Sequence, residues 1–382
     1  MNVVEESTAA PSSPPARRVA VEPWFRIASF PDRTAGNPHH EMFYGGLAAH
    51  GVRMVTRLVC TAGWIRRHAS SLDAVHLHWP EKLWRGKTRG RLHGAIRTVT
   101  LARHRALFTF SRALRAAKRA GLLRVWTVHN MEPHEGATWL DRLGYRIAAR
   151  NSDLIICYSQ AAVEDVRARF QPPGEVVGIA HGNYCGIYPP PRDRATVMRE
   201  LGLDPDIPLV CCIGIIRRYK GMDIACDAVR TLRGAVQLAI CGSPYSKDDT
   251  AVVREQMRDI RGVLVPRALS DQEFADVIGA SEAVLLPYRK ITGSGSLLAA
   301  WTLGRGVIAS DLPLFREMLA TEPKAGQLFR ADDAASLADA IGSYLAMPAR
   351  TRNEAAVRAA NFYSWDSTVE PVVKAFATWN NR

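Results

Sequence analysis

Short, continuous runs of apolar residues alternate with helix-like segments through most of the 382-residue chain. Uninterrupted Val, Ile and Leu runs are typical of strands that are covered on both faces of a parallel sheet. We expect strands at residues 75–79, 125–129, 154–158 and 176–180, and then at 209–216, 236–241, 263–265, 283–287 and 306–310. The segments between them, such as 222–233 and 271–280, have helical patterns. Two such series predict an α/β protein with two Rossmann-like, doubly wound domains facing a cleft.

A proline-rich stretch at residues 188–193 marks the expected boundary between these domains. We predict a first domain over residues 19–188, a second over 192–349, and a C-terminal helical segment over 350–382 that packs on the first domain. Residues 1–18 are rich in Ser, Ala, Pro and Glu and contain no apolar core, so we interpret them as a disordered tail and not a signal peptide.

The seven cysteines form no C-x-x-C pair, and several lie inside apolar runs. This pattern favours reduced, buried thiols in a cytoplasmic protein over a disulfide scaffold or a zinc finger. No run of about 18 uncharged apolar residues exists, which excludes a transmembrane helix from the sequence pattern.

The basic charge is concentrated in one part of the chain. Residues 51–150 contain 20 Lys and Arg against 5 Asp and Glu, while the rest of the chain has a net charge of −2. Within residues 101–120 apolar residues recur at helical spacing and the cations occupy other faces. We favour an anionic membrane surface as the partner of this lobe over a merely solvated helix face. Nucleic acid is not expected, since no recognised binding motif accompanies the charge.

Two cationic loops of the second domain each follow a strand and precede a helix. The first contains Gly214, Arg217 and Lys220, and the second contains Arg289, Lys290 and the pair Ser294-Gly295. Free backbone N–H groups at a helix start, together with Arg and Lys side chains, suit a diphosphate. An exposed basic turn and a plain serine N-cap are the alternative interpretations. Because both loops follow strands of one domain, we expect them to bind one diphosphate.

The first domain has two strand ends that are rich in histidine. His76 and His78 share one face of a strand, with Glu81 just beyond, and His129 follows the next clear strand, with Glu135 six residues on. A single histidine is usually structural. Two strand ends that both carry histidine and glutamate favour a functional site. Metal binding is the rival interpretation; we expect no metal, because no H-E-x-x-H spacing exists.

Three segments now resemble one family. The stretch 213–221 is similar to the G-x-x-R-x-x-K-G element of group 1 glycosyltransferases with the GT-B fold, residues 294–311 resemble their donor loop and following strand, and 362–366 resembles their closing motif. The resemblance spans roughly residues 19–380. It implies a C-terminal helix that returns to the first domain, transfer of a sugar from a nucleotide-diphosphate donor without a cofactor, and a diphosphate site made of Arg217, Lys220, Ser294 and Gly295.

The resemblance also implies roles in the first domain. His129 matches the strand-end histidine that such transferases direct at the donor sugar, and His129, Glu81 and Glu135 are the candidates for a catalytic base. Asn37, His78, His181 and Tyr184 are expected to line the cleft.

Most members of the family have two glutamates with the spacing E-x7-E around the donor loop. In this chain the corresponding positions are Ile291 and Ala299, so both carboxylates are missing. Glu317 and Arg289 are the remaining candidates for contacts with the donor sugar and ribose, although Glu317 is equally interpretable as a surface carboxylate.

Residues 76–81 and 129–135 further resemble exopolysaccharide GDP-mannose:glycolipid β-mannosyltransferases. That resemblance implies a GDP- or UDP-sugar donor, a lipid-linked saccharide acceptor, and a peripheral position on the inner leaflet of the cytoplasmic membrane. A nucleotide-sugar epimerase of GT-B architecture and a non-catalytic nucleotide-sugar or lipid-binding protein are the alternatives. A phosphorylase is less consistent, since no clear pyridoxal lysine is evident.

Overall fold

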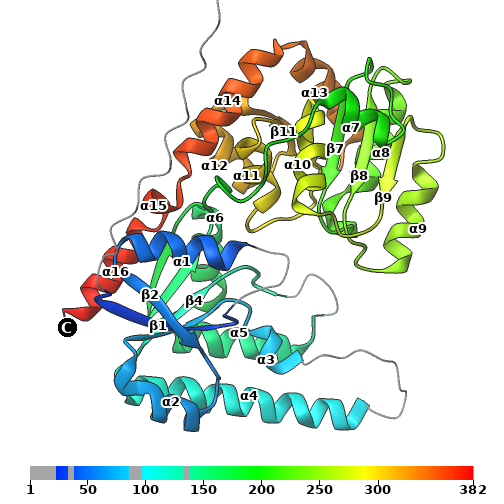
Figure 1. Cartoon of the computed structure of the whole chain (residues 1–382). Coiled ribbons are helices and arrows are strands. Elements are labelled where there is room, and N and C mark those ends of the chain that lie inside the picture. The colour runs from blue at the N-terminus through cyan, green and yellow to red at the C-terminus, as the bar shows by residue number, and fades with distance from the viewer. Residues whose placement is uncertain (1–22, 33–37, 86–95, 133–136, 382) are drawn as a thin grey trace, which may run out of the picture.

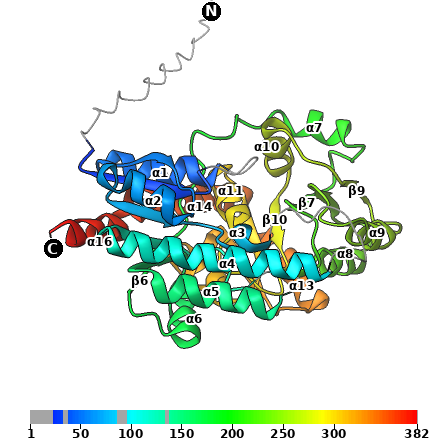
Figure 2. The same cartoon turned by 90° about the horizontal axis from the view of Figure 1, so that it is seen from below.

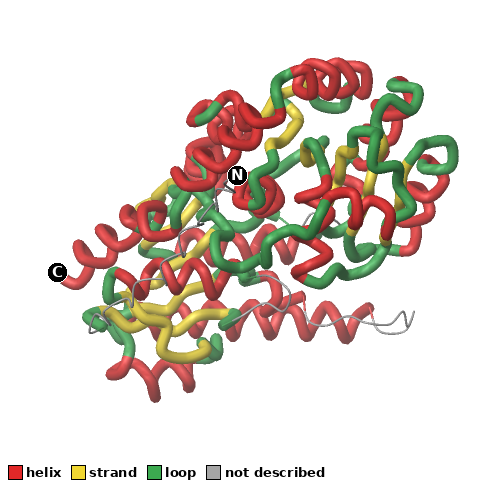
Figure 3. The backbone as a smooth tube through the Cα atoms, turned by 45° about the horizontal axis from the view of Figure 1, so that its top comes forward, coloured by secondary structure: helices red, strands yellow, loops and turns green. Residues whose placement is uncertain are grey.

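The computed structural model describes residues 23–32, 38–85, 96–132 and 137–381. These residues form two α/β domains, each built on its own six-stranded parallel sheet (Figure 1). Figure 3 shows the strands in two separate groups, each enclosed by helices.

The first sheet has the strand order β2-β1-β3-β4-β5-β6, and all its pairs are parallel. Its order reverses between β1 and β3, and ligands of such sheets bind beyond the carboxyl ends of the strands at this switch point. The strands are β1 Phe25–Phe30, β2 Val52–Arg57, β3 Ala74–Leu77, β4 Leu123–Thr127, β5 Leu154–Cys157 and β6 Glu175–Gly178.

Helices cover both faces of this sheet. One face packs on α1 (His39–Ala49) and on the C-terminal helices, through a core that includes Phe43 and Leu47. The other face packs on the helices α2 Ala62–His68, α3 Glu81–Arg85, α4 Ile96–Arg119, α5 Trp139–Asn151 and α6 Gln160–Phe170. The long helix α4 lies along the outer side of the domain (Figure 2). The short 3-10 helix Ala69–Ser71 follows α2.

The second sheet has the order β12-β11-β10-β7-β8-β9, which is the dinucleotide-binding arrangement with its switch point between β7 and β10. Its strands are β7 Leu209–Ile213, β8 Gln237–Cys241, β9 Gly262–Val265, β10 Ala283–Leu286, β11 Gly306–Ser310 and β12 Gly326–Phe329.

Two helical layers enclose the second sheet. One consists of α7 Arg194–Glu200, α10 Asp271–Ala280, α11 Gly295–Thr302, α12 Pro313–Thr321 and α14 Ala349–Phe362. The other consists of α8 Met222–Thr231, α9 Lys247–Gln256 and α13 Ala334–Ala346. Two 3-10 helices, η2 Arg218–Lys220 and η3 Pro323–Ala325, complete the domain.

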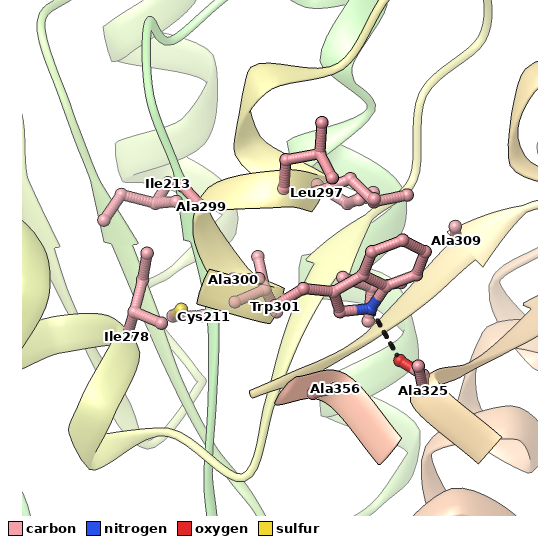
Figure 4. Close-up of a cluster of buried hydrophobic side chains, with 14 of the residues drawn as sticks. Cys211, Ile213, Ile278, Leu297, Ala299, Ala300, Trp301, Ala309, Ala325 and Ala356 are labelled. Carbon is pink, nitrogen blue, oxygen red and sulfur yellow. Dashed lines mark hydrogen bonds between the residues drawn. The ribbon is translucent and has the colours of Figure 1, made fainter. Parts of the chain in front are cut away.

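Helix α11 is fixed by its apolar side, which is buried against the sheet and neighbouring helices (Figure 4). The indole of Trp301 is fully buried, and its Nε1 donates a hydrogen bond of 2.9 Å to the carbonyl oxygen of Ala325. Ala299, at one of the two missing glutamate positions, is also buried in this layer. The core therefore sets where the first turn of α11 lies.

The end of the chain returns to the first domain. After α14 the short helix α15 (Trp365–Thr368) and the helix α16 (Glu370–Asn380) lie against the first sheet, where the Phe376 ring stacks on Phe25 with centroids 4.9 Å apart. The predicted GT-B architecture, including its returning C-terminal helix, is confirmed.

The expected strands all form, but β1, β2 and β12 were not among the strands predicted. Arg26, Arg53 and Gln327 interrupt the apolar character of these three strands. Two of the strands, β2 and β12, are also sheet edges with partly exposed side chains. Edge strands need less apolar surface, so continuous runs do not reveal them.

Candidate active site

The donor half of the predicted site begins where β7 ends at Gly214. This glycine has a φ of 106°, and a Cβ atom on it would lie 2.7 Å from Nζ of Lys220. Gly242, directly after β8, packs closely against Gly214: a Cβ atom on Gly242 would lie 2.0 Å from the carbonyl oxygen of Gly214. Only glycine fits such close approaches of backbone and side chain. The two glycines thus open space at the switch point of the second sheet.

Lys220 is buried beneath this turn, with its ammonium group 5.2 Å from the ring centroid of Tyr288. No hydrogen bond or ion pair of this ammonium group is found within the described ranges. Burial lowers the Lys220 pKa from its ordinary value, since removing a cation from water disfavours the charged form. An anion placed at Gly214 would restore the favourable environment of that charge.

The first turn of α11 faces the same point. The Ser296 hydroxyl lies 3.7 Å from the position that a Gly214 Cβ would occupy. Ser294 is the N-cap, and its side chain accepts a hydrogen bond of 3.3 Å from the backbone N–H of Leu297. Helix N-termini bind phosphate through their free N–H groups and dipole. Lys220 and the helix start therefore converge from two sides.

Arg217 points along the other side of its loop. Its guanidinium lies 3.6 Å from the ring centroid of Tyr245, and it lines a cavity of about 370 Å³ together with Asp248 and Asp249. Its charge also contributes to lowering the Lys220 pKa, so the two cations are electrostatically coupled. The diphosphate role predicted for Arg217 stays a prediction.

The two side chains predicted for the donor sugar and ribose both have protein partners. Arg289 forms a bidentate pair with Asp223, at 2.6 and 3.0 Å, and a 2.7 Å contact with Asp332. Glu317 accepts from the backbone N–H of Gln160, at 3.0 Å, and so joins α12 to the start of α6 in the other domain. Their predicted roles are untested, and each would require exchange of these contacts.

The donor loop touches the first domain directly. The Thr292 hydroxyl donates a 2.6 Å hydrogen bond to the carbonyl oxygen of His129. Cβ atoms on Gly293 and Gly295 would lie 3.6 Å from Tyr158 and 2.6 Å from the Tyr184 hydroxyl, respectively. The donor and acceptor halves predicted from distant parts of the chain thus share one interface.

On the acceptor side, buried histidines gather at the carboxyl ends of the first sheet's strands. His78 Nδ1 and His129 Nε2 are 3.1 Å apart, and His78 Nε2 is 3.1 Å from the Tyr44 hydroxyl. That hydroxyl also lies 2.8 Å from His76 Nδ1, whose ring reaches the Thr127 hydroxyl through Nε2 at 2.8 Å. A continuous chain of polar contacts therefore links β3, β4 and α1.

Three further aromatic or imidazole rings, those of His39, His181 and Trp79, lie around these polar contacts. His39, the first residue of α1, contacts the Tyr158 hydroxyl and lies with its ring centroid 4.9 Å from that of His129. His181 lies 5.1 Å from His39, and its Nδ1 donates to the Gly182 carbonyl oxygen at 2.7 Å. Trp79 stacks on His129 at 3.9 Å. We call the set of His39, His40, His76, His78, His129 and His181 the histidine cluster.

Burial keeps the histidine cluster uncharged. Desolvation, with a smaller contribution from His40, lowers the pKa of His76 to about 3. Desolvation, with a smaller contribution from the Lys82 charge, lowers the pKa of His40 to about 4. The pKa values of His39, His78 and His129 are likewise held well below the ordinary value, chiefly by burial. The cluster thus offers neutral imidazole nitrogens at neutral pH.

Of the predicted carboxylates, Glu81 begins α3, and burial raises its pKa above the ordinary value. A raised carboxyl pKa suits a general base or acid. Glu135 and Asn37 lie outside the described residues. Tyr184 and His181 stack at 5.7 Å beside the Gly295 turn, at the junction between the domains.

Several members of the site were not predicted: His39, His40, Tyr44 and Tyr158. The adjacent pair His39-His40, two residues after the predicted cleft residue Asn37, was the available signal. Tyr44 carries none, since one tyrosine on an amphipathic helix is ordinarily a core residue.

Two Rossmann-like domains and a C-terminal helix that returns to the first domain make up the GT-B architecture. In this protein a buried cation lies at the switch point of the second sheet, and polar side chains lie at that of the first. Residues 207–347, which make up most of the second domain, match the family model described as glycosyl transferases group 1.

The chain is 28% identical over 242 residues to the GDP-mannose:glycolipid 4-beta-D-mannosyltransferase of Xanthomonas campestris pv. campestris, covering 63% of this chain and 62% of that relative's length. It is 22% identical to the alpha-maltose-1-phosphate synthase of Mycolicibacterium smegmatis, over 87% of this chain and 95% of that protein. Among solved structures, sucrose-phosphate synthase from Thermosynechococcus elongatus matches with a TM-score of 0.67 at 17% identity, over 94% of this chain and 99% of that chain.

Proposed function

We propose that this protein is a hexosyltransferase that moves a sugar, mannose in the first instance, from a nucleoside-diphosphate donor to a lipid-linked saccharide. The observation that carries the proposal is the convergence of the buried Lys220 ammonium and the first turn of α11 on Gly214. Both are fixed before any ligand binds, which is the arrangement that stabilises developing charge most effectively.

The leaving group of such a reaction is a diphosphate, and its negative charge grows as the glycosidic bond breaks. Lys220 and the free N–H groups of α11 are suited to stabilise that charge. The histidine cluster lies directly across the Thr292–His129 contact, where the acceptor hydroxyl would approach. If the product is inverted, Glu81, whose pKa burial raises, is the candidate base among the described carboxyls. If the product is retained, the leaving diphosphate takes the proton.

Mannose is proposed because the Xanthomonas relative is named as a GDP-mannose enzyme that acts on a glycolipid. The maltose-1-phosphate synthase relative shows that similar chains are named for other sugars. Both are transferases or synthases, which gives the epimerase alternative no support. The donor set to be compared therefore includes GDP-mannose, UDP-glucose and ADP-glucose.

The test is the release of nucleoside diphosphate with and without a polyprenyl-diphosphate-linked saccharide. We expect release to depend on acceptor and to be fastest with GDP-mannose, and NMR of the anomeric proton would give the configuration. Equal release without acceptor would indicate a hydrolase, and a rearranged free nucleotide-sugar would indicate an epimerase. Tight donor binding with no turnover for any acceptor would favour the non-catalytic alternative.

We further propose that the first domain binds the anionic cytoplasmic leaflet as a peripheral surface. In the described part of the chain, no helix is long and apolar enough to span a bilayer. Arg112, Arg115, Lys118 and Arg119 are exposed on α4, and none forms an ion pair among the described residues. Arg112 and Arg115 line a hollow of about 310 Å³ beside the 58% exposed ring of Phe108. This combination of cations and an exposed aromatic ring is suited to lipid headgroups.

Replacing these four cations by glutamine is expected to reduce binding to anionic liposomes strongly. Each basic residue near the surface contributes roughly 1 kcal/mol, so the four together correspond to about a 1,000-fold loss of partitioning. Co-sedimentation with phosphatidylglycerol vesicles measures it. The matched control replaces four exposed cations of the second domain (Arg254, Arg258, Lys324 and Arg330). Equal losses in both variants would contradict a role for the α4 face.

A further inference from the structure

Three histidines of the histidine cluster come from three different elements and meet at one point. His39 begins α1, His78 follows β3, and His129 follows β4. Each offers a ring nitrogen, and the three nitrogens all lie within 4.8 Å of one another. His39 and His78 are buried, while His129 is partly exposed.

The spacing matches a shared ion better than it matches three separate structural roles. Two imidazole nitrogens bound at about 2.0–2.1 Å to one tetrahedral zinc ion are roughly 3.3 Å apart. His78 Nδ1 and His129 Nε2 are 3.1 Å apart, so this pair needs almost no movement. The His39 ring lies with its centroid 4.9 Å from that of His129, and the ligand nitrogens of all three rings are within 4.8 Å of one another.

The surrounding contacts hold His78 in the required orientation. Its other nitrogen, Nε2, faces the Tyr44 hydroxyl, which in turn faces His76. If His76 donates to Thr127, then Tyr44 donates to His76 and accepts from His78 Nε2, which leaves the lone pair of His78 Nδ1 directed at His129. A metal-binding histidine ordinarily has its second nitrogen fixed by such an outer partner.

We propose that His39, His78 and His129 form a binding site for a divalent transition-metal ion of the zinc type. Three neutral imidazoles suit zinc, cobalt and nickel and not magnesium or calcium, which prefer oxygen. Three protein ligands leave a fourth position of a tetrahedral ion open. The donor loop lies near the site, because the Thr292 hydroxyl donates to the backbone carbonyl oxygen of His129. The proposal of this metal site does not rest on the proposed transfer reaction, although the two share His78 and His129.

The neighbouring charges set the expected strength of binding. The Lys82 ammonium lies 4.7 Å from the Trp79 ring centroid. Its positive charge contributes to lowering the pKa of both His40 and His129. A cation in the cluster would therefore bind against one nearby positive charge and with no carboxylate among its three ligands. We expect a Kd for zinc on the order of 1 μM, far weaker than that of structural sites with thiolate ligands.

The experiment titrates zinc chloride into the untagged full-length chain after chelation and dialysis. A Cys185→Ser background removes the one exposed thiol. We expect one ion per chain by calorimetry, and cobalt substitution should give the intense visible absorption of a tetrahedral site. His78→Gln and His129→Gln should each weaken binding by at least 100-fold, whereas His104→Gln, on the exposed side of α4, should bind as the parent does.

Circular dichroism establishes that each variant is folded. Should the buried His78→Gln fail to fold, the partly exposed His129→Gln provides the decisive comparison. Absence of stoichiometric binding tighter than about 100 μM by the folded parent would overturn the proposal. Unchanged binding in folded His129→Gln would overturn it equally, and the cluster would then be only a neutral hydrogen-bonded lining.

Discussion

Lys220→Ala is expected to lower kcat/KM for sugar transfer by roughly 100- to 1,000-fold, the usual cost of removing one preorganised donor to a developing negative charge. The reason is geometric. The ammonium group is buried beside Gly214, and Ser296 in the first turn of α11 lies close to the same glycine. Because no carboxylate among the described residues forms an ion pair with this ammonium group, its removal leaves no acid unpaired; its nearest aromatic neighbour is the Tyr288 ring. Turnover of donor and acceptor, with donor affinity by calorimetry, measures the effect.

Two companion variants separate chemistry from stability in this test. Lys220→Met keeps most of the buried volume, so it should fold as the parent does and lose as much activity as Lys220→Ala. Lys324→Ala removes an exposed cation from the same domain and should leave turnover unchanged. Retention of more than a tenth of the parental kcat/KM by folded Lys220→Met would show that the diphosphate is bound elsewhere.

Acidification should unfold the first domain well before ordinary acid denaturation. The pKa values of His76, His40 and His181 are lowered by burial to about 3, 4 and 4, against about 6.5 in the unfolded chain. Below pH 6.5 the unfolded chain therefore binds protons that the folded chain does not. Folded-state stability is fully present above pH 6.5 and falls as pH drops toward the folded values.

The size of this effect follows from the linkage relation. Below pH 6.5, each such group lowers the free energy of unfolding by about 1.4 kcal/mol per pH unit. At pH 5 the three histidines together therefore lower it by about 6 kcal/mol. That is comparable with the whole stability of many domains. Thermal unfolding followed by circular dichroism at pH 7.5, 6.5, 5.5 and 5.0 measures it. A Tm that stays level over this range would mean that the cluster is hydrated or already charged at neutral pH.

The sequence predicted the layout of this molecule because its strongest signals are local. Buried parallel strands are continuous apolar runs, and the 271–280 pattern coincides with α10. Lys220 and Ser294-Gly295 lie between a strand and a helix start, as predicted, because these elements are only a few residues apart. Their diphosphate role stays a prediction.

What the sequence did not reveal depends on distant segments. The histidine cluster joins α1, β3, β4 and the segment after β6, so no linear spacing encodes it, and the absence of H-E-x-x-H had no bearing on whether its rings meet. The interdomain pairing of Glu317 with Gln160 is equally invisible, because the two residues are separated by 157 positions. Likewise, nothing near Arg289 indicated that Asp223 would engage its guanidinium.

The chain passes between the domains twice, and the two passages are bonded to each other. Asn183, in the outward passage, donates its backbone N–H to the carbonyl oxygen of Tyr363 at 2.7 Å, while Trp365 Nε1 donates to the Asn183 carbonyl oxygen at 2.9 Å. The outward and the returning connection are thus held side by side, and a shift of one acts on the other. A movement of the domains that separates Thr292 from His129 would therefore also act on the Asn183–Tyr363 and Trp365–Asn183 hydrogen bonds.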